Sequence, residues 1–238
     1  MSLGAPAGLL AVRALGAGEL STEQLVGELA GDRVTYGYVC VSTFVAFTLF
    51  GFVLGRQADR LIELSSEDPL TGLHNRRALS ERLRLELDRA ARYQEPMSFL
   101  LIDVDGLKAL NDRAGHSAGD AALCGVAVAI RVGSRASDLS ARWGGDEFAL
   151  LAPNTGRDAA LALAERIRKL VAEGPASAGD ARVTISAGCS TVESGSPAID
   201  VERLVRLADT ALYEAKRSGR DRVVASGSPR ENPRNASR

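Results

Sequence analysis

The sequence contains few of the residues that build disulfide-bonded or zinc-binding frameworks. Its 238 residues include three cysteines, Cys40, Cys124 and Cys189, and two histidines. The cysteines lie far apart in the chain, so they form neither a disulfide framework nor a zinc-ligand pattern. This composition favours a reducing compartment.

The chain also lacks an excess of charge of either sign. It has 29 Lys and Arg residues against 30 Asp and Glu residues. A protein that binds nucleic acid without sequence preference needs a positive field, so nucleic acid is not an expected partner. At this length the chain has room for one domain with its own core plus a smaller appendage.

One segment, residues 34–55, lacks charge altogether. As a helix it would be about 33 Å long, at about 1.5 Å per residue, which is enough to cross a hydrocarbon core of roughly 30 Å. It is too long for the apolar part of a signal peptide and begins too far from Met1. We therefore predict a transmembrane helix over residues 34–55, with a buried core helix as the alternative.

Basic residues flank this span unevenly. Arg56 and Arg60 follow it closely, with Arg76 and Arg77 just beyond, whereas Arg33 stands among acidic residues on the other side. By the positive-inside rule, this distribution places the C-terminal part of the chain in the cytoplasm.

The rest of the chain alternates between helix-like and strand-like patterns. A helical linker is expected over residues 56–67, ended by Asp68-Pro69 because proline pushes the preceding residue out of the α region. Periodicity predicts helices at about 75–93, 118–132, 159–173 and 201–217, and strands at about 97–104, 139–142, 147–152, 183–189 and 222–225. This mixture indicates an α+β domain over residues 68–225 with helices packed on a sheet. Residues 1–33 form a short segment with no assigned fold, and residues 226–238 a disordered tail.

Two adjacent glycines, Gly144 and Gly145, separate two of the predicted strands. Such a pair predicts a tight hairpin whose turn uses positive φ. The hairpin would present Asp146 and Glu147 at a bare tip, although Asp and Gly are also common in ordinary solvated turns.

A third acid, Asp103, ends an apolar strand-like run. A carboxylate is costly to bury there unless it is paired or coordinated. If that strand lies beside the hairpin, Asp103, Asp146 and Glu147 converge, and clustered carboxylates suit Mg²⁺. The pattern therefore predicts a metal-assisted phosphoryl or nucleotidyl transfer.

Four separated motifs carry a resemblance to a known family: Asp-Pro-Leu-Thr-Gly-Leu-His-Asn-Arg-Arg at 68–77, the block 103–120, Gly-Gly-Asp-Glu-Phe at 144–148, and the stretch 208–220. Together they resemble the diguanylate cyclase (GGDEF) family, and none of them maps to residues 1–67. The resemblance implies a fold like the palm of nucleotide cyclases and polymerases, with a βαββαβ core, a mainly antiparallel sheet and flanking helices. It also implies a homodimer that condenses two GTP into cyclic di-GMP plus two diphosphates. The predicted span and its flanking basic residues, rather than the resemblance, place the chain in the bacterial cytoplasmic (inner) membrane as a single-pass protein.

The resemblance assigns the metal and catalytic roles to the acids already singled out. Asp103, the Val104 carbonyl, Asp146 and Glu147 match ligands of Mg²⁺, with Mn²⁺ as an alternative. Glu147 would also assist deprotonation of the 3′-hydroxyl, and it forms the catalytic group together with Asp146 and Asp103.

Substrate-binding positions come from the same resemblance. Asn111 and Asp120 match residues that bind guanine, and a carboxylate can accept from guanine donors that adenine lacks in that arrangement. The other substrate-binding matches are Lys108, Lys216 and Arg220 for the triphosphate, and Asp112 and His116 beside it. Taken alone, Lys216 and Arg220 would be ordinary cations of a helix C-terminus, and His116 is expected to form structural hydrogen bonds rather than to act as a base.

One position departs from the family pattern. Leu107 stands where the family usually has an aromatic residue. Leucine is still apolar, so we expect it to pack in the core, and the departure puts substrate affinity in doubt rather than activity.

A short motif upstream of the hairpin resembles the family's inhibitory product site. Arg135-x-x-Asp138 has the family's spacing, and Arg166 matches a position that contacts the product from another domain. Arginine suits phosphate and can stack on guanine, while a carboxylate can accept from a guanine edge. The alternative is a surface salt bridge of little energetic value.

Two other functions compete with an active cyclase. A degenerate domain would only bind GTP or cyclic di-GMP and pass a signal to a partner, but Asp103, Lys108, Asp146 and Glu147 are all present. An enzyme that makes an adenine-containing dinucleotide would need relaxed base recognition, which Asp120 argues against.

Overall fold

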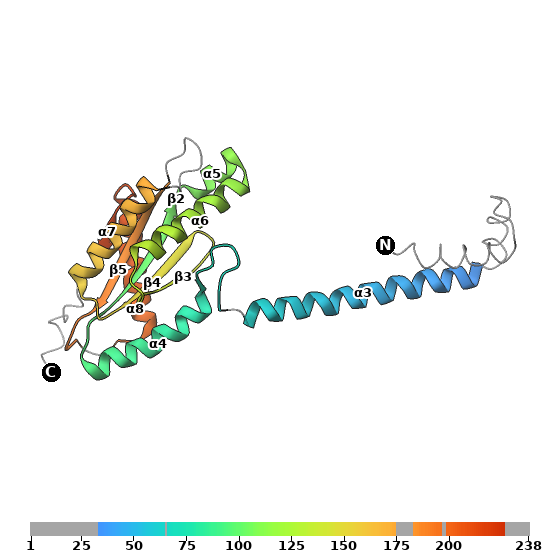
Figure 1. Cartoon of the computed structure of the whole chain (residues 1–238), viewed down its shortest axis with the longest axis horizontal. Helices are drawn as coiled ribbons and strands as arrows, with labels where there is room; N and C mark the ends of the chain where they lie inside the picture. The colour runs from blue at the N-terminus through green and yellow to red at the C-terminus, as the bar shows by residue number, and fades with distance from the viewer. Residues whose placement is uncertain (1–32, 65, 175–182, 197–198, 227–238) are drawn as a thin grey trace, which may run out of the picture. The chain divides into compact units, whose positions relative to one another are not determined.

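The computed structural model describes residues 33–64, 66–174, 183–196 and 199–226, and the chain divides into two compact units, Met1–Ser65 and Ser66–Arg238. Helix α3 (Arg33–Leu64) joins the predicted span and linker without a break (Figure 1). It ends before residue 67, where the prediction placed its end, because Ser66 accepts from the amide of Asn75 (2.9 Å) and Glu67 forms a bridge with His74. The predictions for residues 1–32 and 227–238 lie outside the described residues.

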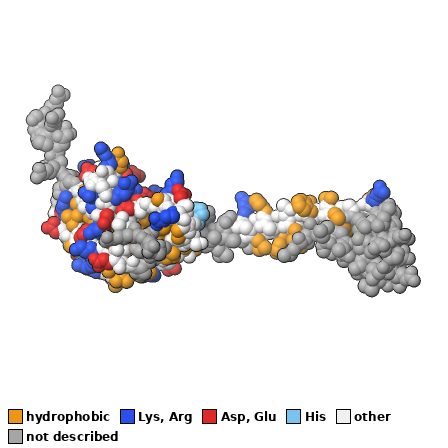
Figure 2. Space-filling model, turned by 90° about the horizontal axis from the view of Figure 1, so that it is seen from above, with side chains coloured by type: hydrophobic (Ala, Val, Ile, Leu, Met, Phe, Trp, Pro, Cys, Tyr) orange, Lys and Arg blue, Asp and Glu red, His pale blue; other side chains and the backbone are white. Residues whose placement is uncertain are grey.

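The apolar part of α3 is long enough to cross a membrane. The stretch Arg33–Arg56 has a mean hydropathy of 2.0, and none of it is buried within the protein. Figure 2 shows hydrophobic side chains along this helix and blue Lys or Arg side chains at its two ends. A helix from the core of a soluble protein meets the same length criterion but is normally covered, and these side chains are not.

The C-terminal unit is built on one six-stranded sheet with the order β1-β3-β4-β2-β5-β6. The strands are β1 (His74–Asn75), β2 (Met97–Asp105), β3 (Leu139–Arg142), β4 (Glu147–Pro153), β5 (Thr184–Val192) and β6 (Val223–Ala225). Strand β2 pairs antiparallel with both β4 and β5, and β3 pairs antiparallel with β4, while the pairings β1–β3 and β5–β6 are parallel. The predicted α+β fold with a mainly antiparallel sheet is confirmed.

Helices cover both faces of this sheet (Figure 1). One core cluster lies under α5 (Leu107–Ala114), α6 (His116–Gly133) and α7 (Arg157–Glu173), and the other under α4 (Arg76–Tyr93) and α8 (Val201–Arg217). Alternate residues of β2 enter the two clusters, with Leu100 and Ile102 on one side and Phe99 and Leu101 on the other. Because side chains alternate along a strand, Asp103 follows Leu101 onto the face of α8.

Two short elements were missed by the periodicity analysis. Helix α5 has only two buried anchors, Leu107 and Leu110, and it lies between Gly106 and Gly115, whose φ angles are +72° and +84°. Strand β1 is only two residues long. Such short segments present too few apolar positions to establish a period.

Gly188 sets the distance between β5 and α8. A Cβ at this position would lie 2.1 Å from the carbonyl oxygen of Ala208 and 2.2 Å from the backbone nitrogen of Leu212. Both contacts are with backbone, which cannot rotate away. The close approach of α8 to the sheet therefore requires glycine here, and it brings the C-terminal end of α8 toward the end of β2.

Candidate functional site

The predicted acids meet at one end of the sheet. The register pairs Asp103, near the end of β2, with Glu147, the first residue of β4. The amide of Val104 donates to the carbonyl of Asp146 at 3.1 Å. The three acids therefore lie on neighbouring stretches of backbone, as expected if β2 runs beside the hairpin.

The hairpin between β3 and β4 is closed by one carbonyl. The amides of Trp143 and Gly144 both donate to the carbonyl of Glu147, at 2.8 and 3.1 Å. Neither Gly144 nor Gly145 is among the residues with positive φ, so the prediction of a positive-φ turn is wrong. A Cβ at Gly144 would instead lie 2.8 Å from Oε2 of Glu147, so this glycine makes room for the carboxylate.

Asp103 is the buried charge of the site. Its side chain is 9% exposed, and the ammonium Nζ of Lys216, on α8, lies 2.8 Å from its Oδ2. Burial raises the pKa of Asp103 to about 6; Lys216 opposes this shift, and the charges of Asp146 and Glu147 add to it. The three carboxylates thus repel one another across the end of the sheet.

The oxygen donors of this end fit a hard divalent cation. Carboxylates and a backbone carbonyl are the ligands that Mg²⁺ and Mn²⁺ accept, and a cation would relieve the repulsion that raises the pKa of Asp103. In the described part of the chain, however, no three His, Cys, Asp or Glu side chains are gathered closely enough to ligate a metal. The acids are neighbours here, and the ammonium of Lys216 occupies one oxygen of Asp103.

The predicted guanine-binding residues lie on the α5–α6 pair next to this end. The exposed members are Lys108, Asp112, His116 and Asp120. Asn111 differs, because its Oδ1 is buried and has no hydrogen-bond partner among the described residues. A Cβ at Gly119 would lie 1.9 Å from this oxygen, so Gly119, which the sequence analysis did not single out, is required for the position of Asn111. A buried acceptor without a donor is unfavourable unless a ligand supplies one.

The remaining predicted residues near this end are accounted for by packing and charge. Leu107 is 9% exposed and belongs to the core cluster, so its predicted packing is confirmed. Arg220 follows α8, and its side chain is 63% exposed. Its Nε lies 4.0 Å from Oδ1 of Asp105.

Arg142 links the β3–β4 hairpin to the turn at Asp68, near the start of the C-terminal unit. Its Nη2 donates to the carbonyl of Gly145 at 2.8 Å, and its Nη1 lies 3.4 Å from Oδ2 of Asp68. Asp68 also accepts from the amide and the hydroxyl of Thr71, at 2.9 and 2.7 Å. Burial alone would raise the pKa of Asp68, but the Thr71 hydrogen bonds and the Arg142 charge outweigh it and lower this pKa. Asp68 belongs to a motif of the sequence, whereas Arg142 was not predicted as a site residue, although its position two residues before the Gly-Gly pair was the available signal.

The candidate product-site residues line one hollow at the opposite end of the sheet. Arg135, Asp138 and Arg166 surround a volume of about 210 Å³ together with Thr155 and Leu163. Asp138 accepts from the backbone amide of Arg135 at 2.8 Å.

The third candidate product-site residue, Arg166, comes from helix α7. Helix α7 places it in this hollow within the same chain, and its Nε donates to the carbonyl of Gly133 at 3.0 Å. Gly133 permits the close packing of α6 on α7, because a Cβ there would lie 2.7 Å from Cγ1 of Ile167. The contact of Arg166 with product bound to a second domain stays a prediction.

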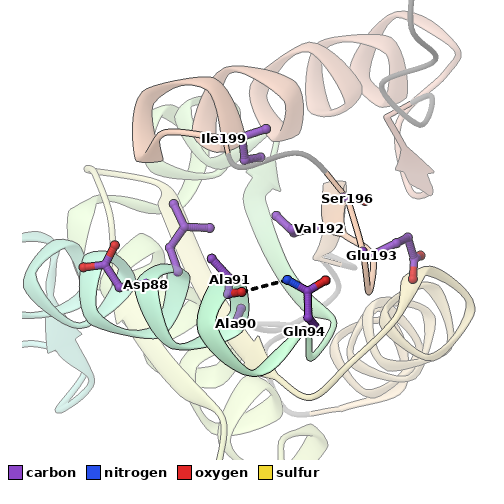
Figure 3. A pocket seen from close by; sticks show the side chains of 10 residues that line it. Asp88, Ala90, Ala91, Gln94, Val192, Glu193, Ser196 and Ile199 are labelled. Atoms are coloured by element: carbon purple, nitrogen blue, oxygen red, sulfur yellow. Dashed lines mark hydrogen bonds between the residues drawn. The ribbon is translucent and has the colours of Figure 1, made fainter.

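Another hollow at that far end contains none of the predicted residues. Its volume is about 80 Å³, and it lies between the end of α4 and the segment after β5 (Figure 3). Asp88, Gln94 and Glu193 are among its lining side chains, and Gln94 donates from Nε2 to the carbonyl of Ala91 at 2.9 Å. Its polar groups do not converge on a common point, so the acidic end of β2 remains the candidate active site.

Comparison with known proteins matches a family to most of the C-terminal unit. Residues 65–222 match the family described as diguanylate cyclase, GGDEF domain. Among curated proteins, the chain is 41% identical over 177 residues to the response regulator PleD of Caulobacter vibrioides, and 42% identical over 171 residues to the diguanylate cyclase DgcM of Escherichia coli. Each match covers 72% of this chain, which spans 38% of PleD and 41% of DgcM.

Solved structures show the same fold. The GGDEF domain of DgcB from Caulobacter crescentus, crystallised in complex with c-di-GMP, matches with a TM-score of 0.62 and 30% identity, covering 68% of this chain and 94% of that one. The diguanylate cyclase SiaD of Pseudomonas aeruginosa, in complex with its activator SiaC, matches with a TM-score of 0.62 and 33% identity over 94% of this chain and 86% of that one.

The raised pKa of Asp103 predicts that this acid destabilises the metal-free protein. Asp103→Asn should increase the free energy of unfolding in EDTA at pH 7.5 by roughly 1–3 kcal/mol, since each pKa unit corresponds to about 1.4 kcal/mol. Because the folded pKa is near 6 and the unfolded value near 3.8, the gain should be full above the folded pKa and vanish as the pH falls below the unfolded value. Denaturation followed by fluorescence of Trp143, the single tryptophan, measures it, with Lys216→Ala as the variant of opposite sign. A less stable Asp103→Asn protein at pH 7.5 would contradict the repulsion inferred here.

Proposed function

Because the chain belongs to the diguanylate cyclase GGDEF family, we propose that it condenses two GTP molecules into cyclic di-GMP, with two diphosphates as the other products. The observation that carries this proposal is the meeting of Asp103, Asp146 and Glu147 at one end of the sheet, within the residues that match the family. We take residues 68–225 as the catalytic domain, 34–55 as a membrane span and 56–67 as a helical linker.

The reaction forms two phosphodiester bonds. In each, the 3′-hydroxyl of one GTP loses its proton and attacks the α-phosphate of the other GTP, and the bond to diphosphate breaks. Asp103, the Val104 carbonyl, Asp146 and Glu147 would hold Mg²⁺, or alternatively Mn²⁺, which activates a hydroxyl and stabilises charge on the leaving group. Glu147 lies beside Gly144 at the open tip of the hairpin, where it can assist removal of the proton.

The guanine base and the triphosphate of GTP would bind to different sets of residues. Asn111 offers a buried acceptor without a partner, and the exposed carboxylate of Asp120 can accept from guanine N1–H and N2–H₂. Lys108, Lys216 and Arg220 supply cations for the triphosphate. Lys216 would have to shift part of its contact from Asp103 to phosphate when a metal binds. Asp112 and His116 lie on the same exposed α5–α6 surface.

A test of the catalytic assignment is Glu147→Gln, which keeps the shape of the side chain but removes its charge. In the full chain with GTP and Mg²⁺, product formation should fall by roughly 10²-fold or more, the usual effect of removing one group that stabilises a transition state. Chromatography of the products measures the rate and identifies the dinucleotide.

The matched control is Glu81→Gln, because Glu81 lies on the outer side of α4 with 68% of its side chain exposed. It should retain the wild-type rate. A folded Glu147→Gln protein that turns over GTP at the wild-type rate would exclude the metal-site assignment. Wild-type protein that binds GTP without forming any product would support the alternative of a domain that only binds nucleotide.

We also propose that activity requires a dimer. One domain has one set of acids, and each GTP needs the α-phosphate of another GTP opposite its 3′-hydroxyl, so two sites have to face each other. Specific activity should therefore fall when the protein is diluted below its dimer dissociation constant, as followed by rate measurements alongside analytical ultracentrifugation. A constant rate per molecule in a sample shown to be monomeric would disprove the dimer requirement.

Product inhibition is proposed for the hollow formed by Arg135, Asp138 and Arg166. Arg135→Ala removes a bidentate contact to phosphate worth roughly 1.5–3 kcal/mol, so cyclic di-GMP should inhibit about one to two orders of magnitude less strongly. Progress curves with added cyclic di-GMP measure this effect, and the initial rate at low product should not change.

The control for this variant is Arg131→Ala, which removes an exposed arginine one turn earlier on α6. Inhibition of this control should match the wild type. Since Arg166 lies in the same hollow, Arg166→Ala should also weaken binding of cyclic di-GMP to the monomer, as measured by calorimetry. Equal inhibition of the wild type and Arg135→Ala would leave Arg135 and Asp138 as surface residues.

Membrane attachment is the last part of the proposal. We place the chain in the bacterial cytoplasmic membrane as a single-pass protein, with residues 68–225 in the cytoplasm and Arg56 at the cytoplasmic end of the span. The uncharged stretch 34–55 of α3, which lies within the uncovered segment Arg33–Arg56, supports this location. The full chain should remain with membranes after an alkaline carbonate wash, and its release into the soluble fraction would refute the span.

A further inference from the structure

Strand β2 carries two acids that face two cations from the end of α8. Asp103 and Asp105 are two residues apart, so they point to the same face of the strand. Lys216 lies in the last turn of α8, and Arg220 lies three residues beyond the end of this helix at Arg217. Nζ of Lys216 lies 2.8 Å from Asp103, and Nε of Arg220 lies 4.0 Å from Asp105. Each cation thus has its own acid.

The two acids have different surroundings. Asp103 is destabilised in its charged form, as described above. The side chain of Asp105 is 6% exposed and is surrounded by donors. Its Oδ1 accepts from the Ser186 hydroxyl at 2.8 Å, and its Oδ2 accepts from the Thr184 hydroxyl at 2.9 Å and from the Asp221 amide at 3.1 Å. These donors satisfy both carboxyl oxygens of Asp105 and fix the orientation of its side chain.

Asp105 also stabilises an unusual backbone conformation. Arg220 and Asp221 both have positive φ, +61° and +46°, which is uncommon for residues other than glycine. Hydrogen bonds hold this turn: Arg220 donates its amide to the carbonyl of Ala215 at 3.1 Å and accepts at its own carbonyl from Nε of Arg222 at 3.0 Å, and Asp221 donates its amide to Asp105. Asp105 therefore accepts from the backbone amide of Asp221 and also lies near the guanidinium of Arg220.

We propose that Asp105 is a positioning residue that presets Arg220 for the polyphosphate of the nucleotide. Asp105 itself is buried and does not reach the substrate, whereas the side chain of Arg220 is 63% exposed. An arginine whose backbone turn is already held, with a carboxylate beside its side chain, loses less conformational freedom on binding phosphate, so the affinity of the site is higher. This inference rests on the proposed function, because it takes Arg220 as a phosphate-binding residue.

The first test is Asp105→Asn, which keeps the volume but removes the charge and one acceptor. KM for GTP should rise about tenfold, with kcat little changed, the pattern expected for loss of an interaction present in both ground and transition states. Affinity for guanosine, which has no phosphate, should stay at the wild-type value. Equal weakening of guanosine and GTP would overturn the proposal, because it would point to a general loss of structure.

A double-mutant cycle shows whether Asp105 changes KM through Arg220. If Asp105 acts through Arg220, then Asp105→Asn should raise KM no further in a chain that already carries Arg220→Ala. Additive effects of the two substitutions would overturn the proposal. Ser186→Ala provides a milder variant in case Asp105→Asn does not fold: it removes one hydrogen bond to Asp105 and should raise KM in the same direction by a smaller factor. An unchanged KM for folded Ser186→Ala and Asp105→Asn proteins would also overturn it.

The matched control is Glu165→Gln. Glu165 pairs with Arg168 at 2.7 Å, and Arg168 in turn pairs with the side chain of Asp221, so this carboxylate belongs to the neighbouring network without touching Asp105 or Arg220. The control should lower the unfolding temperature and leave KM for GTP unchanged; an equal rise in KM would count against a specific role for Asp105. If the wild-type chain forms no cyclic di-GMP, the proposed function fails, and GTP affinities of the wild type and Asp105→Asn, read from Trp143 fluorescence, still test the positioning role.

Discussion

The candidate site depends on a carboxylate that is buried at the end of the central strand. Strand β2 has partners on both edges and helices on both faces, so Asp103 cannot turn to solvent as an acid on an edge strand could. Its charge is tolerated because Lys216 reaches it from α8, and α8 lies close enough because Gly188 has no side chain. The packing of α8 on the sheet therefore determines the electrostatics of the acids.

Glycines in this domain make space for polar side chains as well as allowing unusual backbone angles. Gly119 admits the amide of Asn111, and Gly144 admits the carboxylate of Glu147, and neither glycine has a positive φ. In both cases a methyl group would displace a group that we assign to substrate or metal. The Gly-Gly pair of the hairpin is thus explained by the acid that follows it, rather than by the turn that it makes.

The proposed catalytic site and the proposed product site lie at opposite ends of the sheet. The acids of β2 and β4 lie at one end, and the hollow of Arg135 and Asp138 lies at the other, beyond the start of β3. Product bound in that hollow would not touch the acids, so the inhibition that we propose would operate through the orientation of whole domains. That separation agrees with a reaction that needs two domains to face each other.

The sequence by itself determined the α+β class, the long helices, the central strands and the residues on which the chemistry is proposed. These features follow from local periodicity and from motifs, which need no knowledge of distant contacts. Helix α5 and strand β1 were missed because their segments are too short to show a period. The role of Gly144 was misassigned because it depends on where the carboxylate of Glu147 lies in the folded hairpin. Only the tertiary structure decided that Lys216 pairs with Asp103, that Arg142 fastens the hairpin to Asp68, and that Arg166 shares a hollow with Arg135 in the same chain. Each of these contacts joins residues that are at least thirty positions apart. Strand order and helix packing bring such residues together, and no pattern along the chain encodes these contacts.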